Sequence, residues 1–136
     1  MKIVINRCFG GFELSHKAVM HYAKLKRFKL YPFTNSRGAD GTLSLPRKLV
    51  RWNEKGKEPF IVFYFKAPKP KDRAFFSPQD IKRNDPALVK AVEQLGAEAN
   101  GHCADLGIVE IPDGVGWQIS EYDGQEHVAE THRTWS

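Results

Sequence analysis

Residues 1–18 read MKIVINRCFGGFELSHKA and contain an apolar run, a glycine turn and the start of a helix. The apolar run at residues 3–5 predicts a strand over about residues 2–7. Ser15 is a residue type that caps helices, and it precedes a helical apolar pattern over about residues 16–26. A strand, a glycine turn and a capped helix form an ordinary packing corner, but they are also the parts of phosphate-binding loops. The stretch therefore predicts a helix packed on a sheet and raises the question of an anion site.

The middle of the chain is predicted to hold a buried strand between two loops. Residues 60–65, FIVFYF, form a continuous apolar run. Such a run is typical of a strand that is buried on both faces near the centre of a sheet. Residues 34–46 are rich in Gly, Asn, Asp and Ser, and residues 67–73 alternate proline with lysine. Both segments are therefore predicted to be exposed loops.

A second helix is predicted after Asp85. Asp85 is a favourable N-cap, Pro86 suits the first helical position, and apolar residues follow at helical spacing. We expect the helix to end at Asn100 and Gly101, because both residue types adopt the left-handed conformation that terminates helices.

The last third of the chain is predicted to be β-structure. Residues 108–111 form a strand-like run, and residues 117–135 alternate around an Asp-Gly pair at 123–124, which indicates a hairpin. Two helices and about five mostly antiparallel strands predict an α+β fold with the helices packed on the sheet. The length suits a single domain, residues 1–136, with a basic, loop-rich middle at about residues 31–84.

Charge is distributed unevenly along the chain. The formal net charge is +5, yet the segment from Lys24 to Arg73 holds fourteen basic and four acidic residues. From Glu93 to the C-terminus there are nine acidic residues and one basic residue, Arg133. A basic segment attracts phosphates and other anionic partners. The alternative is that the basic middle and the acidic tail face each other in the fold, or that both are solvated.

The sequence contains no export signal and no apolar window that approaches the roughly 20 residues of a membrane span. We therefore expect a protein without a membrane partner that stays in the cytoplasm. In that compartment Cys8 and Cys103 are expected to be free thiols.

Three blocks of the chain resemble one family. The blocks are KIVINRCFGGFELSHKA at residues 2–18, RNDPALVKAVEQLGAEANG at 83–101 and VEIPDGVGWQISEYDGQEHVAETHRTW at 109–135. They resemble a widespread group of small, uncharacterised proteins of tailed bacteriophages, and the resemblance does not extend to the basic middle. It implies an accessory phage protein that acts on host physiology or host defence in the cytoplasm of the infected bacterium. It transfers no activity and no catalytic residue.

The first functional hypothesis concerns the corner after the first strand. Gly10 and Gly11 let the backbone approach a phosphate, and the amides at the start of the helix at Ser15 can donate to it. Arg7 can add a forked contact, and aromatic rings can cover a base. This hypothesis predicts a non-enzymatic protein that sequesters a nucleotide-like anion, such as a host defence signal. The predicted ligand-binding residues are Asn6, Arg7, Phe9, Gly10, Gly11, Phe12, Ser15, Tyr122, His132, Arg133 and Trp135.

The second hypothesis is DNA or RNA binding through the basic middle, because phosphates attract cations and unpaired bases stack on rings. Trp52 is the aromatic residue expected to reach solvent there. A metal-dependent nuclease version would use Glu121, Asp123, Glu130 and His132. The predicted nucleic-acid contacts are Arg47, Lys48, Arg51, Trp52, Lys55, Lys57, Lys66, Lys69 and Lys71.

A third hypothesis is an inhibitor that docks on a host protein, with the acidic tail as a nucleic-acid mimic. The terminal strand, residues 125–135, has an edge that a second copy of the chain can pair with, which would give a homo-oligomer. No cofactor is predicted, and the spacing of the five histidines does not indicate a zinc site.

Overall fold

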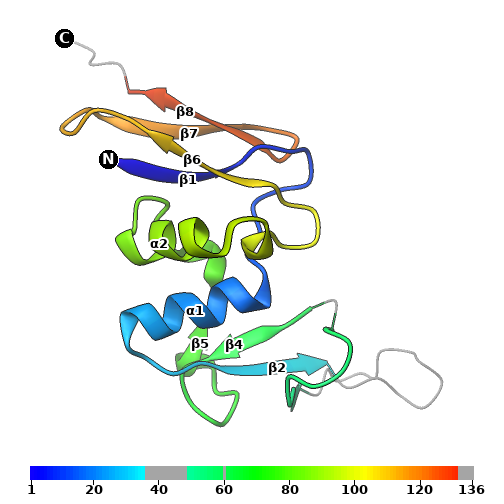
Figure 1. Cartoon of the computed structure of the whole chain (residues 1–136). Coiled ribbons are helices and arrows are strands. Elements are labelled where there is room, and N and C mark those ends of the chain that lie inside the picture. Colours follow the sequence, from blue (N-terminus) through cyan, green and yellow to red (C-terminus); the bar gives the residue numbers. More distant parts are fainter. Residues whose placement is uncertain (36–48, 60, 132–136) are drawn as a thin grey trace. The chain divides into compact units, whose positions relative to one another are not determined.

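The computed structural model describes residues 1–35, 49–59 and 61–131 (Figure 1). The described chain is a mixed α+β structure with two α-helices and eight strands, so the predicted class is confirmed and the strand number is higher than the five expected. The single domain over residues 1–136 stays a prediction, and the chain divides into two compact units. The flanking unit consists of Met1–Lys26 and Pro78–Ser136, and the inserted unit is Arg27–Ser77.

The strands of the flanking unit form two antiparallel pairs. β1 (Lys2–Asn6) pairs with β6 (Leu106–Glu110). β7 (Trp117–Tyr122) and β8 (Gln125–Glu130) form the predicted hairpin. Its turn residues Asp123 and Gly124 have φ values of +52° and +90°, respectively. Positive φ at both central turn residues matches the twist of a two-residue hairpin, which is why an Asp-Gly pair favours this turn.

The helices of the flanking unit pack against one another, and α2 also packs on β1 (Figure 1). α1 spans His16–Lys26, as predicted. Its cap is Ser15, whose hydroxyl accepts a hydrogen bond from the Ala18 amide at 3.1 Å. The buried side of α1 carries Ala18, Val19, Tyr22 and Ala23.

α2 spans Pro86–Leu95 and begins as predicted, because the Asp85 side chain accepts from the Ala87 amide at 2.8 Å. The predicted end at Asn100 and Gly101 is wrong. Gly96, with φ +57°, ends the helix, and a 3₁₀ turn, η3 (Gly96–Ala99), follows it. Asn100 is extended instead, and its side-chain oxygen accepts from the Leu106 amide at 2.8 Å. A contact with the start of β6 therefore replaces the helix cap.

The free edge of β1 is completed by one backbone carbonyl and one side chain. Val4 donates its amide to the Arg83 carbonyl at 2.8 Å, and Asn6 donates its amide to Glu126 Oε1 at 2.8 Å. The Arg83 guanidinium forms a two-pronged ion pair with Glu126, with N···O distances of 2.6 and 2.9 Å. The same guanidinium lies 3.4 Å from the centre of the Phe12 ring. Both ionic side chains are largely buried, so this pair is part of the core.

The inserted unit is a four-stranded antiparallel sheet with the order β3-β2-β4-β5. Its strands are β2 (Tyr31–Asn35), β3 (Leu49–Arg51), β4 (Phe63–Phe65) and β5 (Phe75–Phe76). A 3₁₀ turn, η1 (Asp72–Ala74), precedes β5, and another, η2 (Pro78–Asp80), opens the second part of the flanking unit.

The strand predicted over residues 60–65 is shorter than expected. β4 lies in the middle of its sheet, and Tyr64 and Phe65 are buried, as the apolar run predicts. Ile61 lies outside the strand and is 49% exposed, so burial of the whole run is wrong, and residue 60 lies outside the described residues. Among the described residues of the run, Ile61 and Val62 have no ladder partner, so the strand is shorter than the run.

The two predicted loops have different outcomes. Residues 34–35 belong to β2, and residues 36–46 lie outside the described part of the chain. Residues 68–73 are exposed, as expected for the proline-lysine segment. Across the described ranges, no helix is long and apolar enough to cross a membrane.

Candidate functional site

Asn6, the first residue of the predicted anion site, has a structural role. Its side chain is fully buried. Its amide group donates to the carbonyls of Cys8 and Gly124 at 2.8 and 2.7 Å, and its oxygen accepts from the Asp105 amide at 2.9 Å. These bonds join the end of β1 to the turn of the hairpin and to the chain before β6. A ligand contact would have to replace them.

The glycines of the corner make close backbone packing possible. A Cβ atom at Gly10 would overlap the Cys103 carbonyl, and one at Gly124 would overlap the Gly10 and Gly11 amide nitrogens. The corner and the hairpin turn therefore pack backbone against backbone. The sequence allowed either a packing corner or a phosphate-binding loop here, and these contacts are those of a packing corner.

The start of α1 is occupied by protein groups. Besides accepting from Ala18, the Ser15 hydroxyl donates to the Glu98 carbonyl at 2.6 Å, and the Ser15 amide donates to the Ala99 carbonyl at 2.9 Å. The Glu98 side chain forms an ion pair with Lys17 at 2.9 Å. A carboxylate beside the first turn reduces the attraction that the helix end offers to an anion.

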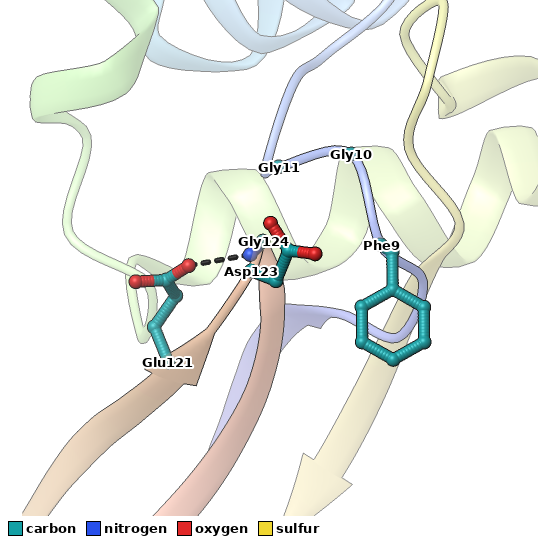
Figure 2. Close-up of a pocket in the computed structure, with 6 residues that line it drawn as sticks. All are labelled: Phe9, Gly10, Gly11, Glu121, Asp123 and Gly124. Carbon is teal, nitrogen blue, oxygen red and sulfur yellow. Dashed lines mark hydrogen bonds between the residues drawn. The ribbon is translucent and has the colours of Figure 1, made fainter.

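An open pocket of about 460 Å³ lies beside this corner (Figure 2). Its lining residues are Phe9, Gly10, Gly11, Glu121, Asp123 and Gly124. The Phe9 ring is 62% exposed and forms one side of the pocket. Glu121 accepts a hydrogen bond from the Gly124 amide. Among the residues that the structure describes, two carboxylates and no basic side chain line this pocket, so its charge opposes an anionic ligand.

The other predicted ligand contacts do not line the pocket. The Arg7 side chain lies against Gly107, and its Nη2 donates to the Ile108 carbonyl at 3.3 Å. Phe12 is buried, in contact with the Arg83 guanidinium. Tyr122 is 77% exposed, and strand alternation places it on the opposite face from Glu121. The remaining predicted contacts, His132, Arg133 and Trp135, lie outside the described residues.

The residues proposed for a nuclease centre are not all close together. Glu121 and Asp123 lie at the turn of the hairpin, whereas Glu130 is opposite Trp117 at its other end. Glu121 is opposite Glu126, and Glu130 lies four residues further along β8, while His132 lies outside the described residues. Within residues 1–35, 49–59 and 61–131, no group of three or more potential metal ligands forms.

The inserted unit concentrates positive charge. Its sequence holds twelve basic and four acidic residues, while the flanking unit holds nine basic and twelve acidic residues. Two predicted contacts, Arg47 and Lys48, lie outside the described residues. Nine basic residues of the unit are described, all are exposed, and none forms an ion pair with an acid of the described chain. They are Arg27, Lys29, Arg51, Lys55, Lys57, Lys66, Lys69, Lys71 and Arg73.

Three of these cations lie over aromatic rings. Arg51 is 4.9 Å from the ring centre of Tyr31, and Lys29 is 5.5 Å from the same ring centre. Lys66 lies 4.9 Å from the ring centre of Phe28. Trp52, expected to be the exposed ring, is half-buried, and its amide donates to the Pro32 carbonyl at 3.0 Å. The sequence predicted the mixture of cations and rings but not which rings they contact.

Comparison of the chain with protein-family models, with curated proteins and with solved structures finds no match.

Proposed function

We propose that this protein binds nucleic acid through the exposed basic surface of its inserted unit. The observation that carries the proposal is the set of nine described Lys and Arg side chains, all exposed and none paired with a described acid. Cations without acid partners are the groups that neutralise phosphates and release their counterions. The aromatic rings beneath three of them add surface that a base can contact.

The flanking unit supports this proposal by contrast. There, Lys2, Lys17 and Lys26 each form an ion pair, with Glu93, Glu98 and Asp85, respectively. The flanking unit also has exposed lysines without a described acidic partner, Lys24, Lys82 and Lys90. The inserted unit differs because none of its described cations is paired with a described acid. Since the excess charge lies within one unit, self-repulsion there is relieved when a polyanion binds.

The resemblance of three sequence blocks to proteins of tailed bacteriophages supports a setting for this activity. We propose an accessory phage protein that acts on nucleic acid in the cytoplasm of the infected bacterium. The basic unit lies in the part of the chain to which that resemblance does not extend. We therefore expect the basic unit to give this protein a function that the phage proteins with similar blocks do not share.

The test is the salt dependence of binding to a fluorescently labelled oligonucleotide, measured by anisotropy. We expect the logarithm of the binding constant to fall linearly with the logarithm of salt concentration. The double variant Lys69→Glu/Lys71→Glu should reduce the magnitude of this slope by about 1.4 if both lysines contact single-strand phosphates.

The matched control is Lys82→Glu/Lys90→Glu, which makes the same change of charge at two exposed lysines of the flanking unit. We expect this control to bind with a slope close to that of the unmodified protein. Equal losses in both double variants would show that only total charge matters, and salt-independent binding or no binding would overturn the proposal.

The pocket beside Gly10 and Gly11 favours a second candidate, capture of a nucleotide-like small molecule. The observation in its favour is that Phe9, Gly10 and Gly11, three predicted contacts, line the pocket. Glu121 and Asp123 oppose a phosphate there, so the base or sugar would have to enter the pocket. A nucleotide at 100 times its dissociation constant should raise the stability by about 2.7 kcal/mol. A melting-temperature screen with nucleotides and nucleosides, repeated on Phe9→Ala, tests this candidate, and an unshifted melting temperature throughout would reject it.

A further inference from the structure

Aromatic side chains form a row on one face of the inserted unit's sheet. In its ladders, Tyr31 is opposite Phe65, and Phe65 is opposite Phe75. Directly opposite residues have their side chains on the same face of a sheet, and so do residues two apart in one strand. Phe33 therefore shares this face with Tyr31. The ring of Phe65 makes edge contacts with Phe33 and Phe75, with ring-centre distances of 5.3 and 5.4 Å.

The most exposed ring of this row lies at one edge of the sheet. Phe33 and Phe65 are buried, whereas Phe75, on the edge strand β5, is 49% exposed. The buried Phe65 contacts Phe75 and restricts its orientation, because a packed ring leaves few rotamers open to its neighbour. About half of Phe75 is thus left exposed to solvent beside a buried, packed ring.

Three cationic residues precede this exposed ring in the chain. Lys69, Lys71 and Arg73 lie in the segment that leads into β5, and all three are exposed. The segment is closed by a hydrogen bond from the Lys66 amide to the Ala74 carbonyl at 2.7 Å. A partner that covers the ring must therefore combine negative charge with a flat face. Unpaired nucleotides have both properties, since phosphates alternate with bases that stack on aromatic rings.

We infer that the nucleic acid bound by the inserted unit is single-stranded and that one base stacks on Phe75, with phosphates near Lys69, Lys71 and Arg73. The inference rests on the proposed function and specifies its substrate class. A duplex is a poorer partner because its bases are stacked on one another and their faces are not available to a protein ring. Arg51, opposite Phe33 on the same face, continues the cationic surface on the other edge strand.

The experiment compares the affinity of the full chain for a labelled single strand of about 12 nucleotides, within the range of single-strand site sizes, with its affinity for the corresponding duplex. We expect tighter binding of the single strand. Phe75→Ala should weaken single-strand binding by about 5- to 150-fold, the contribution of one stacked base, and leave duplex binding unchanged. The salt slope should stay the same in this variant, because no cation is removed.

Two further variants keep the test decisive. Phe75→Leu retains an apolar side chain that can support the fold but removes the aromatic face, so it should also weaken single-strand binding. Tyr122→Ala removes an exposed ring of the flanking unit that does not line the pocket, and it should leave single-strand binding unchanged. Equal affinity for single strand and duplex, with Phe75→Leu neutral, would overturn this inference alone. Binding to neither oligonucleotide would overturn the proposed function as well.

Discussion

The flanking unit and the inserted unit use charged side chains in different ways. In the flanking unit, Arg83 and Glu126 are largely buried, form a two-pronged ion pair and complete the edge of β1. In the inserted unit, the nine described Lys and Arg side chains are exposed and have no acidic partner among the described residues. The comparison shows that charge contributes to the fold where it is buried and paired, and is available for a partner where it is exposed and unpaired. The following predictions test this distinction in order of expected effect.

The largest effect is expected for the buried ion pair. Glu126→Gln removes one charge and leaves the Arg83 guanidinium without its counter-charge, so the free energy of unfolding should fall by about 3–5 kcal/mol. Urea denaturation measures this change. Lys2→Ala, which breaks the exposed pair with Glu93, is the control and should cost less than about 1 kcal/mol. Similar losses in the two variants would show that burial does not distinguish these ion pairs.

A second effect separates backbone packing from backbone conformation. Gly124→Ala places a methyl group against the amides of Gly10 and Gly11 at φ +90°, and we expect a loss of at least about 2 kcal/mol. Gly56, in the inserted unit, has φ +77° with open space around it, so Gly56→Ala should cost about 1 kcal/mol from conformation alone. Thermal unfolding of both variants tests the difference, and equal losses would mean that the corner can move away from the hairpin turn.

A third effect concerns the cap of α2 and its pH dependence. Burial alone would raise the pKa of Asp85, but hydrogen bonds from Tyr22, Lys26 and the Ala87 amide hold it below the ordinary value near 3.8. Burial and the hydrogen bond to Asp85 raise the pKa of Tyr22. A carboxyl group whose pKa is lowered in the folded state stabilises the fold at pH values above its unfolded-state pKa. This stabilisation is lost as the pH falls through its folded-state pKa.

Asp85→Ala should therefore lower the free energy of unfolding by about 1 kcal/mol at pH 7. The difference from the unmodified protein should shrink below about pH 4, where the carboxyl group takes up a proton in the unfolded state before it does so in the folded state. Denaturation curves at pH 7 and pH 3 measure both differences. A difference that stays constant with pH would show that the ionised form of Asp85 makes no special contribution.

The smallest effect on stability is expected for the unpaired cations. Lys69→Ala/Lys71→Ala should change the free energy of unfolding by no more than about 0.5 kcal/mol, because neither side chain has an acidic partner in the described chain. The same variant should weaken oligonucleotide binding at low salt. Chemical denaturation and anisotropy on one preparation test both statements, and a large loss of stability would show that these lysines contribute to the fold.

Local signals in the sequence predicted the elements that depend on a few neighbouring residues. The start of α2 follows from Asp85 and Pro86, and the hairpin follows from Asp123 and Gly124, because caps and two-residue turns use bonds between residues close in sequence. The end of α2 was not predicted correctly. Gly96 ends the helix, and Asn100 instead forms a β-bridge with Leu14, more than 80 residues away in the sequence.

In the candidate sites, too, the sequence predicted features set by neighbouring residues and missed features set by distant contacts. The pattern of strand, glycines and helix directed attention to Phe9, Gly10 and Gly11, which do line a pocket. The pattern gave no indication that the hairpin turn, more than 100 residues further along, supplies Glu121 and Asp123 to the same pocket. Phe75 was also missed, because the sequence does not state how far each ring of an aromatic-rich segment is buried.

The sequence by itself determined the α+β class, the start of both helices, the turn of the hairpin and the concentration of positive charge in the middle of the chain. These properties are set by composition and by interactions over a few residues. The tertiary structure alone decided that Arg83 and Glu126 meet at the edge of β1, that carboxylates line the pocket beside Gly10, and that Phe75 remains exposed. The physical reason is that burial and charge pairing depend on which distant segments come together, and the spacing of residues along the chain does not specify those contacts.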